Sequence, residues 1–212
     1  MFSHTFVDWD DTVYNTVAFK ADIFGIFAKH GANEKDIKET FLKSLCTVAP
    51  HQYDYTFEEH TQFLRDLGYN LPDTVEAELN ALFSKNYLFP DTEMFLQFLK
   101  SVSDKVVLLS AGDKTFQLNK IRDSGISDRF DELVILSGNK EKYLGDNYNN
   151  NKIFFINDNL RENLSVKQEV PAALVVTKLN TSRYSEEEAK QVGAPYFKTL
   201  SEIKQYVEQQ IK

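Results

Sequence analysis

Short apolar runs that stop abruptly at polar residues restrict the fold of this chain more than any other feature of its sequence. Each run has the length of a β-strand. Four of the five consist mainly of Val, Ile, Leu and Phe with little alternation, which is typical of parallel strands covered on both faces. The runs are Phe2 to Val7, Lys105 to Leu109, Leu133 to Leu136, Ile153 to Ile156 and Ala173 to Val176. They predict the strands of one parallel sheet.

Apolar residues at helical spacing separate these runs. They recur at i, i+3, i+4 and i+7 before the second run, and a similar stripe lies near the end of the chain. The two stripes are Phe95, Phe98, Leu99 and Val102, and Leu200, Ile203, Val207 and Ile211. The alternation of strands and helices predicts an α/β fold with a doubly wound parallel sheet.

The span from Thr12 to Asn86 interrupts this alternation, because it has helical periodicity throughout and no strand pattern. Its first apolar stripe is Val17, Ala21, Phe24 and Ala28. We expect a helical cap inserted after the first strand, over the strand ends where open α/β sheets bind ligands. The expected division is a core of residues 1–13 and 88–212 and a cap of residues 14–87. Candidate cap contacts for a substrate are Tyr14, Phe19, His51 and Tyr53.

Composition excludes several classes of partner. With 24 Lys+Arg against 32 Asp+Glu, the net charge is −8, which argues against general nucleic-acid binding. No apolar stretch approaches the length of a membrane span, and the mean hydropathy is −0.41. The single cysteine, Cys46, cannot form an internal disulfide, and the first residues do not resemble a signal peptide. We therefore expect a cytoplasmic protein; the oligomeric state is not predicted.

Three acids, Asp8, Asp10 and Asp11, follow the first strand in FVDWDDT. In an extended segment Asp8 and Asp10 point to the same side. Two such carboxylates can divide the work, one attacking an electrophile and the other moving protons, while their crowding invites a cation such as Mg²⁺. A solvated acidic turn or a helix N-cap is the alternative interpretation.

The next two strand ends carry groups that suit a phosphate. VVLLSAGDK places the Ser110 hydroxyl and the amides of Ala111 and Gly112 ahead of a helix, where they can form an anion cradle or only a turn and cap. SGNKEKYL supplies a positive charge from Lys140 or Lys142. We prefer Lys140, which is nearer the end of the strand.

The fourth strand end, IFFINDNLREN, contains Asp158. This aspartate would face the first acids and complete a metal site with Asp8 and the backbone carbonyl of Asp10. An Asx turn or N-cap is the alternative for Asp158. Glu162 could bind a metal-bound water or face solvent.

These four strand-end motifs, in this order, resemble those of the haloacid dehalogenase (HAD) superfamily of aspartate-nucleophile phosphohydrolases. FVDWDDT resembles the first motif, with Asp8 as nucleophile and Asp10 as acid/base, and VVLLSAG with Ser110 resembles the second. Lys140 matches the third, and NDNLRE with Asp158 resembles the fourth. The resemblance extends over almost the whole chain and implies a Rossmann-like core with a helical cap.

The resemblance implies a Mg²⁺-dependent phosphatase that hydrolyses a small phosphorylated metabolite through a phosphoaspartyl intermediate at Asp8, with water activated by Asp10. Haloacid dehalogenases resemble this chain but lack a carboxylate at the place of Asp10, because a halide needs no proton. The alternatives are a sugar-phosphate mutase and a non-catalytic binding protein. The chain departs from the family pattern at Asp11 and Asn157, where Gly is common, and at Glu162, which replaces a frequent aspartate.

Overall fold

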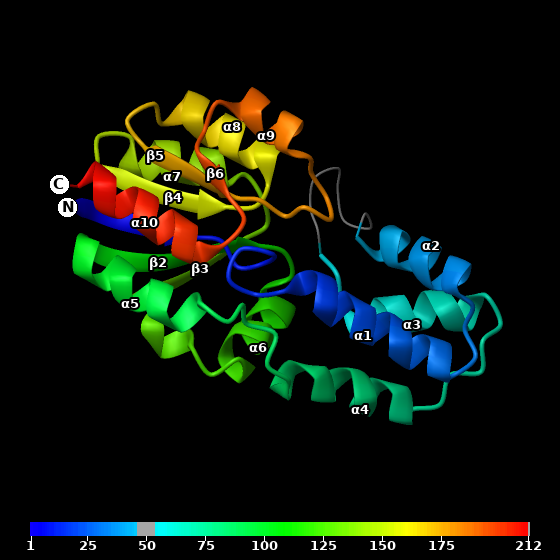
Figure 1. Cartoon of the computed structure of the whole chain (residues 1–212). Helices are drawn as coiled ribbons and strands as arrows, with labels where there is room; N and C mark the ends of the chain where they lie inside the picture. Colours follow the sequence, from blue (N-terminus) through cyan, green and yellow to red (C-terminus); the bar gives the residue numbers. More distant parts are fainter. Residues whose placement is uncertain (46–53, 212) are drawn as a thin grey trace.

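The computed structural model describes residues 1–45 and 54–211, and its centre is a six-stranded sheet (Figure 1). All neighbouring strands are parallel and their order is β3-β2-β1-β4-β5-β6, so the predicted α/β architecture is confirmed. The strands are β1 (Phe2–Val7), β2 (Ser103–Ala111), β3 (Glu132–Leu136), β4 (Ile153–Asn157), β5 (Leu174–Lys178) and β6 (Tyr196–Phe197). The two-residue β6 is too short to give a strand pattern in the sequence, and it was not predicted.

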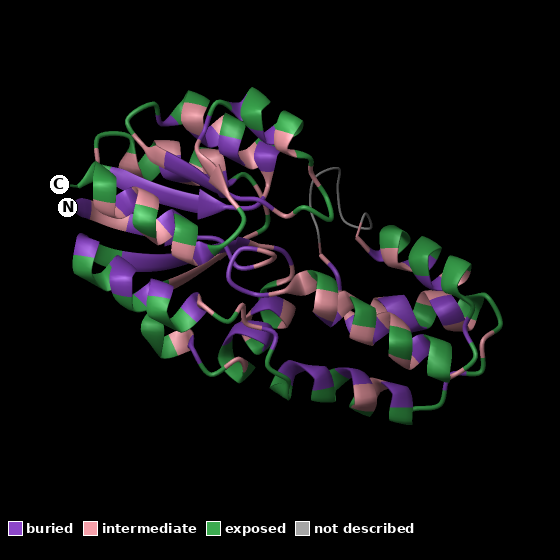
Figure 2. Cartoon of the chain, in the orientation of Figure 1, coloured by how far each residue is buried: buried purple, intermediate pink, exposed green. Residues whose placement is uncertain are grey.

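Helices cover both faces of this sheet, and the strand residues alternate between two apolar clusters. Phe154 and Ile156 pack on one face with α5 (Thr92–Val102), α6 (Lys114–Asp123) and α10 (Leu200–Gln210). Phe155 packs on the other face with α7 (Lys140–Tyr148), α8 (Leu160–Glu169) and α9 (Glu186–Val192). A short 3₁₀ helix, η2 (Ser127–Arg129), precedes β3. Figure 2 shows that the central strands are buried while the outer helix faces are exposed.

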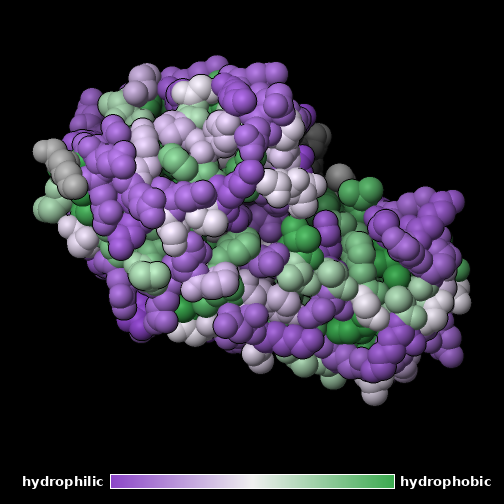
Figure 3. All heavy atoms as spheres, viewed as in Figure 1, coloured by the Kyte–Doolittle hydropathy of each residue, from purple (hydrophilic) through white to green (hydrophobic). Residues whose placement is uncertain are grey.

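A second group of helices lies between β1 and α5 in the sequence and extends to one side of the sheet (Figure 1). Its elements are α1 (Thr16–Lys29), α2 (Glu34–Ser44), α3 (Phe57–Asp66), α4 (Thr74–Ala81) and η1 (Leu82–Ser84). We refer to the helices of residues 16–84 as the cap helices. In Figure 3 hydrophilic residues predominate over the sheet part of the visible face, and hydrophobic residues are more frequent over the cap helices.

The buried face of α1 differs from the predicted one. Phe19, Ile23 and Phe27 are buried, whereas Val17 of the predicted stripe is 41% exposed. Apolar residues surround this helix, so its sequence fits more than one stripe and packing against the neighbouring helices selects the face. Cys46 and two of the candidate cap contacts, His51 and Tyr53, lie outside the described residues.

The two segments that connect the cap helices to the sheet are hydrogen-bonded to each other. The amide of Asn15 donates to the carbonyl of Tyr87 at 2.7 Å, and the amide of Phe89 donates to the carbonyl of Val13 at 3.1 Å. The side chain of Asn15 also caps α1 by accepting from the amide of Ala18. The cap helices therefore leave and rejoin the sheet at one place, next to the end of β1.

None of the helices in the described ranges has the length and apolar character needed to cross a bilayer.

Candidate active site

The order of the strands brings the predicted motifs to one edge of the sheet. The chain adds β2 and then β3 on one side of β1, and afterwards adds β4, β5 and β6 on its other side. The strand order therefore reverses between β1 and β4. Open parallel sheets bind ligands at such a reversal, beyond the carboxyl ends of the strands. The amide of Asp8 donates to the carbonyl of Ile156 at 2.9 Å, which aligns the first aspartate with the end of β4.

Asp8 forms an ion pair with Lys140 inside the protein. The Lys140 Nζ donates to Asp8 Oδ1 at 2.6 Å, and the Thr12 hydroxyl donates to Asp8 Oδ2 at 3.2 Å. Asp8 and Lys140 are each 4% exposed, whereas Lys142 is exposed. Asn139, the residue before α7, adopts a left-handed φ of 57°, which turns the chain so that Lys140 starts the helix facing β1.

The charges of this pair follow from burial and from neighbours. Burial raises the pKa of Asp8 to about 6, although Lys140 acts in the opposite direction. Burial alone would lower the pKa of Lys140, but Asp8 and Glu162 outweigh it and raise this pKa above its usual value. The lysine is therefore a fixed cation, whereas the aspartate titrates near neutral pH.

Glu162 faces this lysine. Its Oε2 lies 2.9 Å from the Lys140 Nζ, and the amide groups of Asn157 and Asn159 donate to its carboxylate at 2.8 and 3.2 Å. Burial would raise the pKa of Glu162, but Lys140 and Asn157 hold it below its usual value. Glu162 thus contributes a second negative charge that fixes the position of Lys140.

Asp158 is buried beside Asp8, and among the described residues its carboxylate forms only a long ion pair. It is 5% exposed, and its Oδ2 accepts no hydrogen bond from residues 1–45 or 54–211. The guanidinium of Arg183 lies 3.8 Å from that oxygen, which is too far for a hydrogen bond. Burial, and then the charges of Asp8 and Asp11, raise the pKa of Asp158 well above its usual value.

A divalent cation fits this arrangement. In residues 1–45 and 54–211, no three His, Cys, Asp or Glu side chains are placed to hold a metal. The two buried carboxylates at the strand ends that could serve as donors are Asp8 and Asp158. The backbone carbonyl of Asp10 is the remaining predicted donor. A buried carboxylate oxygen without a partner beside a second acid is the environment in which a hard cation such as Mg²⁺ is favourable.

Asp10 lies elsewhere than an extended strand would place it. Its carboxylate accepts from the Thr16 hydroxyl, from the Gln117 amide at 2.8 Å and from the Lys120 ammonium. Gln117 and Lys120 belong to α6, on the opposite face of the sheet from the Lys140 that binds Asp8.

The two carboxylates therefore bind helices on opposite faces of the sheet, and the expectation that they point to one side was wrong. The physical reason is that β1 ends at Val7 and the chain turns at Asp11, whose φ is 55°. Burial would raise the pKa of Asp10, but Lys120, Thr16 and Gln117 lower it overall.

The predicted anion cradle needs one correction. Ser110 is 1% exposed and lies at the end of β2, beside β1, and Ala111 is the last residue of that strand. The amide of Gly112, however, donates to the carbonyl of Leu136 at 3.0 Å. Because the ladder between β2 and β3 continues one residue past β2, this amide cannot also bind a phosphate in the observed arrangement.

Sequence reasoning missed the groups that bind Asp10. The sequence contains a pattern that could have indicated them, because Gln117 and Lys120 share the buried face of α6 with Ile121. Polar residues at core positions of a helix need partners inside the protein. Lys178 was missed too; its Nζ lies 3.4 Å from the backbone carbonyl of Asp11.

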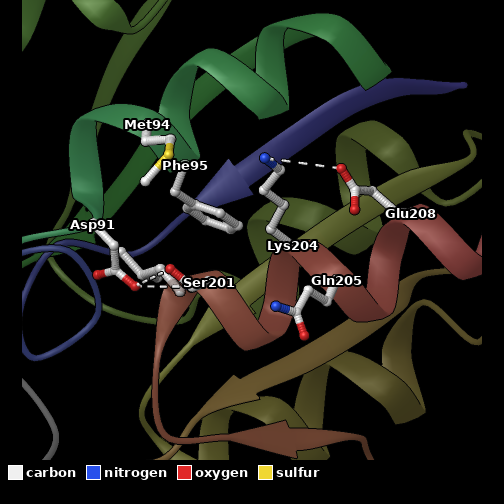
Figure 4. Close-up of a pocket in the computed structure, with 8 residues that line it drawn as sticks. Asp91, Met94, Phe95, Ser201, Lys204, Gln205 and Glu208 are labelled. Carbon is white, nitrogen blue, oxygen red and sulfur yellow. Dashed lines mark hydrogen bonds and ion pairs between the residues drawn. The ribbon is translucent and has the colours of Figure 1, made fainter.

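A pocket of about 300 Å³ lies away from these residues, between α5 and α10 (Figure 4). Its polar groups contact one another: the amide and hydroxyl of Ser201 donate to Asp91 at 2.8 and 2.9 Å, and Lys204 lies 3.9 Å from Glu208. None of the predicted site residues lines this pocket. We therefore assign the candidate site to the strand ends.

Comparison with known proteins identifies the fold. No family model and no curated protein matches the chain. A putative haloacid dehalogenase-like hydrolase from Burkholderia xenovorans superposes with a TM-score of 0.76 at 17% identity, covering 100% of both chains. A putative β-phosphoglucomutase from Thermotoga maritima gives 0.68 at 15% identity, covering 99% of each chain. The L-2-haloacid dehalogenase of Xanthobacter autotrophicus gives 0.61 at 15% identity, covering 98% of this chain and 99% of that one. The chain therefore has the haloacid dehalogenase-like fold that its strand-end motifs predict.

Proposed function

We propose that the protein is a hydrolase of phosphate monoesters, with Asp8 as the nucleophile. The observation that carries this proposal is the buried contact of 2.6 Å between Asp8 and Lys140, at the switch point of the sheet. A phosphoryl group bound there would meet a carboxylate that can attack phosphorus and a fixed cation that offsets the added negative charge. Ser110, at the end of the neighbouring strand, is the proposed hydroxyl donor to the phosphate.

The reaction has two steps. A carboxylate oxygen of Asp8 attacks phosphorus, the bond from phosphorus to the ester oxygen breaks, and the leaving oxygen takes a proton from Asp10. Water then gives a proton to Asp10 and attacks the aspartyl phosphate, which releases inorganic phosphate and restores Asp8. Lys140 keeps its proton throughout, and Glu162 holds it in place at 2.9 Å.

Mg²⁺ is the proposed cofactor, held by Asp8, Asp158 and the backbone carbonyl of Asp10. When bound, it would offset the negative charge of the phosphate and of the two acids. The buried Oδ2 of Asp158, which accepts no hydrogen bond from the described residues, supports this assignment.

A phosphosugar mutase is the second candidate. It uses the same two acids and requires that water be kept from the phosphoaspartate, and the 4% exposure of Asp8 favours such exclusion. The similarity in fold to a putative β-phosphoglucomutase points the same way. Dehalogenases share the fold as well. A halide leaves without taking a proton, however, so a dehalogenase would have no use for the acid role of Asp10.

The test is turnover of p-nitrophenyl phosphate with and without Mg²⁺, in the wild type and in Asp8→Asn. We expect Mg²⁺-dependent phosphate release in the wild type and a loss of at least about a thousandfold in Asp8→Asn. Asp128→Asn, which removes an exposed carboxylate, is the matched control.

The outcomes separate the candidates. Equal rates in wild type and Asp8→Asn would refute the nucleophile and favour a non-catalytic binding protein. Interconversion of sugar phosphates without release of phosphate would identify a mutase. Chloride release from 2-chloropropionate, without phosphatase activity, would identify a dehalogenase.

A further inference from the structure

Lys120 is a buried cation that the proposed reaction does not use. It lies on α6, it is 3% exposed, and its ammonium donates to Asp10 Oδ1. A buried ammonium is costly unless it is paired, and Asp10 is the acid that pairs with Lys120. Removal of either partner would leave the other charge unpaired inside the protein.

Three aromatic rings complete the surroundings of this ammonium. The Nζ lies 5.2 Å from the ring centre of Tyr14, 5.6 Å from that of Phe19 and 5.8 Å from that of Phe116. These distances are within the range of cation–π attraction, which is stronger in a desolvated site. We call Lys120 and these three rings the lysine box.

The lysine box includes residues from both parts of the molecule. Phe19 belongs to α1, the first of the cap helices, and Phe116 belongs to α6, which packs on the sheet. Phe116 also contacts Phe57 and Phe83 of the cap helices, with ring centres 4.9 and 5.3 Å away. Movement of the cap helices relative to α6 would therefore open the lysine box and expose its ammonium to water.

The carboxylate of Asp10 is held from the same two directions. Thr16, at the start of α1, and Lys120 of α6 both donate to Oδ1, while Gln117 of α6 donates to Oδ2 at 2.8 Å. Gln117 is itself fixed, because its amide also donates to the carbonyl of Ala111 at 3.1 Å. Lys120 supplies the only full positive charge among these three donors.

We propose that Lys120 is a positioning residue that fixes the orientation of the Asp10 carboxylate and makes this orientation depend on the packing of the cap helices against α6. The inference rests on the proposed function, in which Asp10 exchanges a proton with the leaving group and with water. Fixed geometry matters there, because a proton transfer requires the acid within hydrogen-bonding distance of the reacting oxygen. An Asp10 without this anchor would sample other orientations.

The experiment compares two substrates that differ in their need for a proton. p-Nitrophenyl phosphate has a good leaving group, whereas glycerol 2-phosphate needs protonation of an alkoxide. In Lys120→Met we expect kcat/KM, which reports the step in which the leaving group departs, to fall by about tenfold or more for glycerol 2-phosphate and to stay within about threefold for p-nitrophenyl phosphate. The value of kcat also contains the second step, in which Asp10 takes a proton from water for either ester, so the quantity compared is the loss in kcat/KM on the two substrates. Lys120→Arg should restore most of the loss, and Arg122→Met, an exposed cation on the same helix, should behave as wild type.

A second arm tests the dependence on the cap helices. Phe19→Leu removes one ring from the lysine box and should reproduce the selective loss on glycerol 2-phosphate. Because both changes act through one contact, Phe19→Leu combined with Lys120→Met should be no slower on this substrate than Lys120→Met alone. Losses that multiply in the double variant would overturn the link to the cap helices.

The controls separate this inference from the proposed function. Equal turnover in wild type and Asp8→Asn would overturn both. Asp8-dependent turnover with equal losses on the two substrates in Lys120→Met would overturn the inference alone, because a general loss of structure slows both reactions together. If Lys120→Met is unfolded at the assay temperature, Lys120→Gln, which keeps a donor without the charge, is assayed in its place. A selective loss on glycerol 2-phosphate then supports the inference, and equal losses on the two substrates overturn it.

Discussion

Replacement of Asp8 by Asn should make the metal-free protein more stable at neutral pH while it abolishes turnover. Burial raises the pKa of Asp8 from 3.8 to about 6. The folded state therefore binds this proton more tightly than the unfolded state does. The resulting stabilisation is complete below the unfolded pKa and is lost as the pH rises through the folded pKa of about 6. Above that pH, the ionised aspartate makes folding less favourable than a neutral side chain would.

The size of the effect follows from the two pKa values of Asp8. At ~1.36 kcal/mol for each pKa unit, the difference corresponds to about 3 kcal/mol at pH 7.5 and to well under about 1 kcal/mol near pH 4. For a chain of 212 residues this is a rise in Tm of roughly 6 to 12 °C. Lys140 keeps Glu162 as a partner at 2.9 Å in the variant, so the substitution does not leave a buried cation unpaired.

The assay is urea unfolding in EDTA at pH 4 and pH 7.5, on the wild type, Asp8→Asn and the exposed control Asp128→Asn. We expect the free energy of unfolding of Asp8→Asn to exceed that of the wild type only at the higher pH. A variant less stable than the wild type at pH 7.5 would refute the reasoning, since it would mean that the contact with Lys140 outweighs the burial of the aspartate.

Two further predictions concern the other acids. Addition of Mg²⁺ at about a hundred times its Kd should stabilise the wild type by about 2.7 kcal/mol in thermal unfolding, but it should not stabilise Asp158→Asn. An equal shift in both proteins would mean that Asp158 is not a metal ligand. Asp10→Ala should lower kcat/KM for glycerol 2-phosphate roughly 100-fold more than for p-nitrophenyl phosphate, because a good leaving group needs less protonation in the first step. Equal slowing of the two substrates would count against Asp10 as the acid.

The strands and their ends could be predicted from the sequence because a buried parallel strand leaves a local pattern. Each apolar run must stop where the sheet stops, and the polar residue that follows it is placed at the edge by the topology. Asp8 and Asp158 come to the same edge in this way, although 150 residues separate them in the sequence. No knowledge of side-chain packing is needed for that inference.

Features that depend on the rotation of a helix could not be predicted in the same way. In α1, apolar residues on several sides left the buried face undetermined, and packing selected Phe19, Ile23 and Phe27. The pairing of Asp10 with Lys120 has the same origin, since it joins residues 110 positions apart through the orientation of α6. The amide of Gly112 was misassigned because the length of the ladder between β2 and β3 depends on both strands.

The two buried lysines give the two acids of the first motif opposite titration behaviour. Lys120, together with two neutral donors, outweighs burial and lowers the pKa of Asp10, whereas Lys140 is shared with Glu162 and leaves the pKa of Asp8 raised. In the protein without substrate Asp10 is thus a carboxylate at neutral pH, the form that accepts a proton from water in the second step, and it must take up a proton before it can protonate the leaving group in the first step. Asp8 gains from a further positive charge, because a cation beside it would favour its ionised, nucleophilic form. This need for positive charge is a physical reason to expect that activity of the proposed enzyme depends on a divalent metal.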